Sequence, residues 1–256
     1  MHPNLSHGRF ELESEAAWRD LVRQGYDAVT LGVNEIQAWD FTKRMLEETP
    51  LPLVCSNLER LVDDKWVPLG EPYKIVEKAG VKVGIISAIG GPQLAESSVQ
   101  RKTGGEVRLL PPVENAQRFA EKAREEGAEV VILLAHIEDS SLEEYASLLD
   151  GYVDVIVGGR HTVKAPGPTK PDGTNVIINR SGTRGQHIAV TRLIVDPKGK
   201  IKDFGGKNVT LGPDMPEDEE IAAEVARVKE EAKARLRENR KARRKKTEGQ
   251  EEKAHP

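Results

Sequence analysis

The sequence is poor in aromatic side chains, which make up only 4% of its 256 residues. Proteins that hold single-stranded nucleic acid commonly stack its bases on aromatic rings, so this scarcity argues against such a platform. The formal net charge of −4 also predicts no general attraction to polyanions. The sequence therefore carries no specific nucleic-acid signal.

Cysteine and long apolar runs are scarce as well. The single cysteine, Cys55, excludes an internal disulfide, and its place in the run LPLVCS predicts a buried side chain. No stretch approaches the roughly 20 apolar residues of a membrane span. The N-terminus lacks the charged start and apolar core of a signal peptide, so the chain as written is expected to be soluble and its compartment stays open.

Apolar and amphipathic segments alternate along most of the chain, which predicts a layered α/β domain over residues 1–212. The expected helices are 14–25, 35–49, 113–127 and 140–151. The expected strands are 26–32, 50–56, 128–138, 153–159, 175–180, 187–196 and 200–211, with a hairpin over 72–90 that turns at Lys78-Ala79-Gly80. Residues 90–111 are rich in glycine, serine and charge, and they are expected to form a long surface loop.

The last part of the chain, residues 213–256, has a different composition. Acidic side chains dominate residues 214–231 and basic ones dominate 233–246, an order that complements the dipole of one long helix. The pattern predicts a charged C-terminal helix followed by a disordered end.

Polar residues follow three of the predicted strands. They are Gly32-Val33-Asn34-Glu35, then Ala135-His136, then Gly158-Gly159-Arg160-His161-Thr162. In a parallel sheet these carboxyl ends meet at one edge, where ligands bind in open α/β folds. Imidazoles and carboxamides gathered there suit a divalent metal.

Six segments in order resemble the 5′-nucleotidase branch of the calcineurin-like metallophosphoesterases, between about Gly25 and Asp196. They are GYDAVTLGVNE, PLVCSNL, PYKIVEKAGVKVGIISAI, VVILLAHIE, VDVIVGGRH and NVIINRSGTRGQHIAVTRLIVD. The resemblance implies a layered α/β/β/α metallophosphoesterase-like sandwich, here lacking its first strands, plus the long charged helix. It also implies kinship to phosphate-ester hydrolases of nucleotide catabolism, which are often periplasmic or extracellular.

The family's reaction resembles two-metal hydrolysis, in which two divalent ions such as Mn²⁺ or Zn²⁺ clamp a phosphate ester. It requires an Asp-x-His and a Gly-Asp motif, and neither is present before the first matching segment. Where the family has Gly-Asn-His-Glu, Val33 replaces the metal-binding asparagine and Asn34 replaces the histidine that assists the leaving group. An alkyl side chain cannot bind metal, and a carboxamide cannot supply a proton near neutral pH.

The resemblance assigns roles to six residues. His136 is the expected metal ligand, with Asn34 and Glu35 at the catalytic position. His161 falls on the residue between the two histidines of the family's Gly-His-x-His, and a one-residue shift would make it the second expected ligand. Arg160 falls on the first histidine of the family's Gly-His-x-His, where it is expected to contact phosphate; Asn57, at a strand tip, is a second candidate for substrate contact or for a turn.

Three interpretations stay open. In the first, the chain is a fragment or a mis-started gene, and an upstream segment supplies two strands and the aspartates. In the second, the chain binds a phosphorylated small molecule without turnover, with Arg180 and Arg184 assisting Arg160. In the third, it is an interaction module. Missing strands would expose sheet edges, so either a partner or the chain's own N-terminal helix is expected over that edge. A partner that binds the C-terminal helix is also expected.

Overall fold

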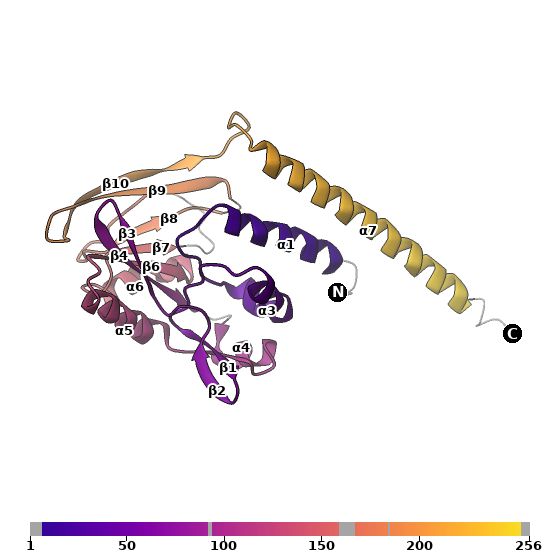
Figure 1. Ribbon diagram of the computed structural model, residues 1–256, viewed down its shortest axis with the longest axis horizontal. Helices are drawn as coiled ribbons and strands as arrows, with labels where there is room; N and C mark the ends of the chain where they lie inside the picture. Colours follow the sequence, from indigo (N-terminus) through magenta and orange to yellow (C-terminus); the bar gives the residue numbers. More distant parts are fainter. Residues whose placement is uncertain (1–6, 92–93, 159–166, 184, 252–256) are drawn as a thin grey trace. The chain divides into compact units, whose positions relative to one another are not determined.

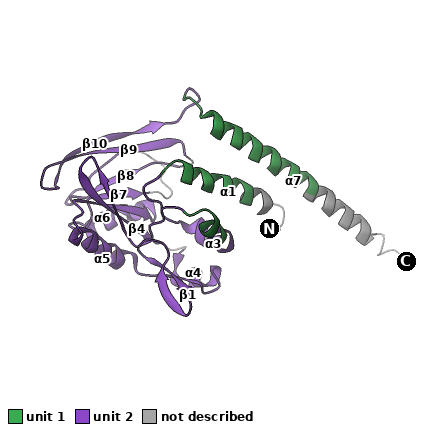
Figure 2. Cartoon of the chain, in the orientation of Figure 1, with its two compact units in different colours: residues 1–25, 44–50, 215–256 green, residues 26–43, 51–214 purple. Residues whose placement is uncertain are grey.

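The computed structural model describes residues 7–91, 94–158, 167–183 and 185–251 (Figure 1). These residues divide between two compact units, coloured separately in Figure 2. The smaller unit comprises residues 1–25, 44–50 and 215–256, and the larger one residues 26–43 and 51–214. The candidate residues that the structure describes all belong to the larger unit.

A five-stranded sheet forms the centre of the larger unit, in the order β3-β4-β6-β7-β8. The strands are β3 (Lys74–Lys78), β4 (Val81–Ile89), β6 (Val130–His136), β7 (Val155–Gly158) and β8 (Ile177–Arg180). β3 and β4 are antiparallel, whereas β4, β6, β7 and β8 run parallel. The carboxyl ends of these four strands therefore lie along one edge of the sheet.

Two helices cover one face of this sheet, namely α5 (Pro112–Glu125) and α6 (Leu142–Leu148), which follows a short 3₁₀ turn at Asp139–Ser141. The buried side chains of α5 recur with helical spacing at Ala116, Phe119, Ala120 and Ala123, so one stripe of the helix faces the strands. Most residues of β6 are buried, which agrees with a strand that is covered on both faces.

Two smaller sheets complete the larger unit. β1 (Leu58–Val62) pairs with β2 (Lys65–Pro68) and with β5 (Val107–Leu109), while β9 (His187–Val195) and β10 (Ile201–Thr210) form a long hairpin. The strands β1 and β2 were not predicted from the sequence.

The prediction of a long surface loop over residues 90–111 is wrong in part. The segment contains α4 (Glu96–Lys102) and the strand β5, and the side chains of Val99 and Val107 are fully buried. These two apolar anchors fix the segment to the unit in spite of its polar composition, because burying each valine is favourable.

The two strands expected at 26–32 and 50–56 are reduced to isolated bridges. Val29 pairs with Leu53, and Val54 pairs with Glu71, but no longer ladder forms in either segment. The helix expected over 35–49 is divided into α2 (Val33–Gln37) and α3 (Trp39–Glu48), because Ala38 leaves helical geometry with a ψ angle of 44°.

Other expectations are confirmed. The hairpin over 72–90 turns at Ala79 and Gly80, and the helix over 113–127 and the strand after it form as predicted. Ser141 lies at the N-cap of α6, and its side chain makes no capping hydrogen bond.

The smaller unit contains α1 (His7–Arg23), a segment over residues 44–50 and α7 (Glu219–Glu251), which is the predicted charged helix. Trp18 is buried and its Nε1 donates a hydrogen bond to the carbonyl of Thr49 at 2.9 Å. Val228 of α7 is also buried. None of the helices described is long and apolar enough to cross a membrane. The domain boundary expected after residue 212 stays a prediction, and the disordered end expected beyond residue 251 lies outside the described residues.

Candidate functional site

The candidate site lies at the carboxyl end of β6, where His136 meets the segment Gly32–Glu35. The main-chain N–H of Val33 donates a hydrogen bond to Nε2 of His136 at 3.1 Å. A Cβ atom on Gly32 would lie only 2.7 Å from Cε1 of His136, so the imidazole packs directly against this glycine. The structure thus brings together two of the three polar segments that the sequence analysis expects at strand ends, although of these two only His136 lies at the end of a strand.

Glu35 closes the first turn of α2. One of its carboxylate oxygens, Oε2, accepts a hydrogen bond from the N–H of Gly32 at 2.8 Å, while its main-chain carbonyl accepts one from Oγ1 of Thr42 at 2.8 Å. This arrangement is the carboxylate half of a capping box, which satisfies an N–H at the helix start. Asn34, beside it, is exposed, and its main-chain carbonyl accepts a hydrogen bond from Ala38.

Asn57 is fully buried, and three hydrogen bonds join its side chain to the main chain. Its Nδ2 donates to the carbonyls of Ile89 at 2.8 Å and Leu110 at 3.1 Å, and its Oδ1 accepts from the N–H of Ile89 at 3.0 Å. Since Ile89 is the register partner of His136, Asn57 supports the end of β4 beside the candidate site. These bonds give Asn57 a structural role, and a contact with substrate stays a prediction.

The third strand end is described only as far as Gly158, which lies beside Ala135 in the register of β6 and β7. Arg160 and His161 lie outside the described residues, as does Arg184. Arg180, at the end of β8, forms ion pairs with Asp139 at 2.6 Å and with Glu143 at 3.7 Å, and its side chain is 11% exposed. Its guanidinium is therefore already neutralised by carboxylates, which limits its value for binding phosphate.

Asp139 is a residue of this edge that the sequence analysis did not select. Its position three residues after His136 was only a weak indication that it belongs to the site, because an acidic residue near the start of a helix usually only stabilises that helix. The partner of Asp139 is Arg180, 41 residues later in the chain, and no local pattern indicates that pairing.

Cys55 is buried, as predicted, with 1% of its surface exposed. Burial raises the pKa of its thiol to about 12. A thiol of this kind stays protonated at neutral pH and is a poor nucleophile and metal ligand.

The described residues do not fit a two-metal centre. No group of three or more histidine, cysteine, aspartate or glutamate residues in that part of the chain is placed to hold a metal ion. Nε2 of His136 already accepts a hydrogen bond, and the buried side chain of Val33 has no donor atom at all. Whether His136 and His161 bind a divalent metal stays a prediction.

The comparisons with known proteins agree on one kinship. No family model matches the sequence. A snake venom 5′-nucleotidase from Crotalus adamanteus is 28% identical over 233 residues, which cover 80% of this chain and 37% of that protein. The chain thus spans less than half the length of this relative.

Solved structures with the same fold are similar over most of the chain. A 5′-nucleotidase precursor from Thermus thermophilus has a TM-score of 0.69 and 22% identity, covering 87% of this chain and 46% of that one. The calcineurin-like phosphoesterase YfkN from Bacillus subtilis has a TM-score of 0.68 and 20% identity, covering 91% and 79%. The chain is thus similar in sequence to 5′-nucleotidases, and it shares its fold with a 5′-nucleotidase precursor and a calcineurin-like phosphoesterase.

Proposed function

We propose that this chain binds a phosphorylated small molecule on a phosphoesterase frame and that, as given, it carries out weak or no two-metal hydrolysis. The observation that carries the proposal is the hydrogen bond from the N–H of Val33 to Nε2 of His136. His136 is the residue that the resemblance assigns to metal binding, and its ring nitrogen is occupied by the main chain of the neighbouring loop.

The chemistry of imidazole supports this proposal. A ring nitrogen that accepts a hydrogen bond uses the same lone pair that would bind a metal ion. Metal binding at Nε2 of His136 would therefore have to displace the N–H of Val33, leaving that buried main-chain donor without its partner. The other ring nitrogen, Nδ1, would lie 3.0 Å from a Cβ atom on Gly32, so it also faces the main chain closely.

The ligand class follows from the kinship and from the residues that remain. The named relatives are 5′-nucleotidases, so 5′-AMP is a suitable probe. The carboxamide of Asn34 is able to hydrogen-bond to a phosphate oxygen, and the guanidinium of Arg160 is able to grip phosphate through two parallel hydrogen bonds. Both assignments are part of the proposal.

Calorimetry and a phosphate-release assay on the same sample test the proposal. The purified chain is titrated with Mn²⁺ and Zn²⁺ and then with 5′-AMP. We expect no stoichiometric metal binding and no release of phosphate above background. We also expect 5′-AMP to bind to the wild-type chain, and to bind at least several-fold more weakly after Arg160→Ala.

Two histidine variants provide the controls. His136→Ala is compared with His187→Ala, because His187 lies on β9, outside the strand β6 and the segment Gly32–Glu35 that form the candidate site. Stoichiometric metal binding with turnover that His136→Ala abolishes and His187→Ala preserves would contradict the non-catalytic part. Absence of 5′-AMP binding by the wild-type chain would contradict the binding part.

A further inference from the structure

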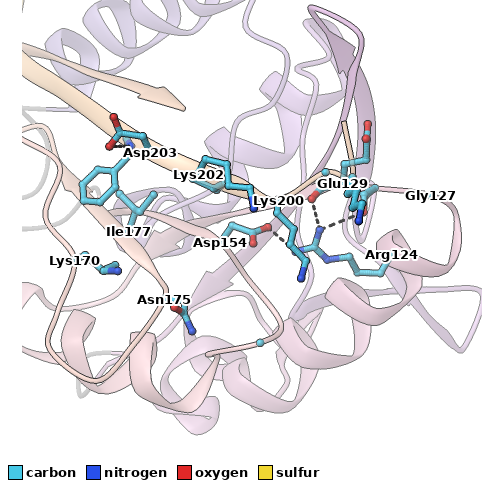
Figure 3. A pocket seen from close by; sticks show the side chains of 16 residues that line it. Arg124, Gly127, Glu129, Asp154, Lys170, Asn175, Ile177, Lys200, Lys202 and Asp203 are labelled. Carbon is cyan, nitrogen blue, oxygen red and sulfur yellow. Dashed lines mark hydrogen bonds and ion pairs between the residues drawn. The ribbon is translucent and has the colours of Figure 1, made fainter. Parts of the chain in front are cut away.

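We propose that the larger unit has a second binding site, for a small multivalent oxyanion of the di- or triphosphate class, at the opposite edge of its sheet. A pocket of about 860 Å³ lies there (Figure 3). Its lining includes Glu129, Asp154 and Asn175, which come just before β6, β7 and β8. The pocket is therefore at the amino ends of the parallel strands, whereas His136 is at their carboxyl ends.

One wall of the pocket is the turn that joins β9 to β10, residues 196–200. Oδ1 of Asp196 accepts hydrogen bonds from the N–H groups of Lys198 and Lys200, both at 2.9 Å. Gly199 packs against the start of β6, where a Cβ atom would lie 2.8 Å from Cβ of Glu129. The turn is thus held both internally and against the sheet, so the two lysines extend from a fixed main chain.

The floor of the pocket is fixed by Arg124. Its Nη1 donates to the carbonyls of Ala128 at 3.2 Å and Glu129 at 2.6 Å, and its Nη2 bonds to Oδ2 of Asp154 at 2.5 Å. Figure 3 shows these three bonds as dashed lines. Oδ2 of Asp154 also accepts the N–H of Val131 at 2.6 Å, so the pair forms part of the scaffold.

The lining has an excess of positive charge. Five cationic side chains face three carboxylates, and they are Arg124, Lys170, Lys198, Lys200 and Lys202 against Glu129, Asp154 and Asp203. The carboxylates are engaged by main-chain donors, since Glu129 accepts the N–H of Lys82 and Asp203 accepts that of Phe204. Lys202 pairs with Asp196 at 3.0 Å, just outside the lining.

Three lysine ammonium groups of this lining differ from its other charged groups in that they have no acceptor among the described residues. Among the residues that the structure describes, no acceptor contacts the side chains of Lys170, Lys198 or Lys200. They approach the pocket from two different segments, the loop before β8 and the turn of the hairpin. A pocket that collects unpaired cations of this kind raises the local concentration of anions.

The chemistry selects a small oxyanion with several charges. Ammonium groups bind phosphate oxygens as point charges, and three of them around one hollow match several phosphate groups better than a single one. A divalent cation would be repelled by the same groups. A long polyanion is disfavoured because the chain as a whole carries a net charge of −4.

Calorimetric titration of the full chain with inorganic triphosphate tests this inference. We expect binding with one site per chain at low salt, about tenfold weaker in the double variant Lys198→Ala/Lys200→Ala, because two exposed ion pairs are lost. The matched control is Lys65→Ala/Lys102→Ala, which removes the same charge from two exposed lysines on β2 and α4. We expect this control to bind as the wild type does.

Either of two results would overturn the inference, namely no binding of triphosphate by the wild-type chain, or equal weakening in both double variants. The test involves neither metal nor 5′-AMP, and it does not touch the strand-end residues. Its failure is therefore distinguishable from a failure of the proposed function.

Discussion

The φ angle of Gly32 is −122°, in the extended region that any residue adopts, so its main chain does not require glycine. What excludes a side chain at this position is the imidazole of His136, together with the Oε2 atom of Glu35, 2.9 Å from an added Cβ. Glycine here is thus a packing requirement of the candidate site and not a turn requirement.

Gly32→Ala should therefore destabilise the protein by about 1–3 kcal/mol, the usual cost of forcing a group into a packed site. Chemical denaturation gives this change in the free energy of unfolding. Gly205→Ala is the matched control, because an added Cβ there meets nothing within 4 Å. In the double variant Gly32→Ala/His136→Ala the steric cost should largely disappear, and an unchanged cost would contradict the contact.

How much of the candidate site could be predicted differs from residue to residue. The sequence analysis expects His136 and Gly32–Glu35 at strand ends, and the two segments do meet, although residues 26–32 pair only through the bridge between Val29 and Leu53. It could not predict that the N–H of Val33 bonds to Nε2 of His136, since that contact joins residues 103 positions apart and involves a main-chain atom. The same holds for Asn57, whose polar side chain at a strand tip suggested a ligand contact but is used by carbonyl and N–H groups of other segments.

At the scale of an element, the turn of the β3–β4 hairpin affects how stable the hairpin is. Ala79 has a φ angle of 53° and Gly80 one of 78°, so both central residues adopt the left-handed conformation of a type I′ turn. Glycine tolerates this conformation, whereas alanine is strained in it. The hairpin thus contains one favourable and one unfavourable turn residue.

Ala79→Asn should stabilise the protein by roughly 0.5–1 kcal/mol, because asparagine followed by glycine is a preferred type I′ pair. Gly80→Ala should destabilise it by about 1 kcal/mol or more, and purely through the main chain, since an added Cβ there meets nothing within 4 Å. Thermal and denaturant unfolding of both variants provide the measurement. If both substitutions shifted stability in the same direction, the turn geometry would be contradicted.

Elements with a strong local pattern were the predictable ones. The helical spacing of the apolar residues in α5 and the continuous apolar run of β6 are sufficient to define them. The segments at 26–32 and 50–56 also contain apolar residues but pair only at Val29–Leu53 and Val54–Glu71. A strand depends on a neighbour to complete its ladder, and no property of its own residues reveals whether that neighbour is in place.

At the scale of the whole molecule, the buried thiol of Cys55 makes the stability of the folded chain depend on pH in the alkaline range. Burial raises the pKa of this thiol from 9.0 to about 12. Above pH 9 the unfolded chain releases the thiol proton, while the folded chain retains it until about pH 12. The folded state therefore loses stability relative to the unfolded state as the pH rises through this window.

The free energy of unfolding should fall between pH 9 and pH 12 by about 1.4 kcal/mol per pH unit more in the wild type than in Cys55→Ala. Urea unfolding of both proteins at several pH values in this range gives the two slopes. Lysine and tyrosine side chains titrate in both proteins, so their contribution cancels in the difference, and Cys55→Ala lowers stability by a constant amount through the lost packing. Parallel slopes would mean that water reaches the thiol in the folded state, which would contradict the burial of Cys55.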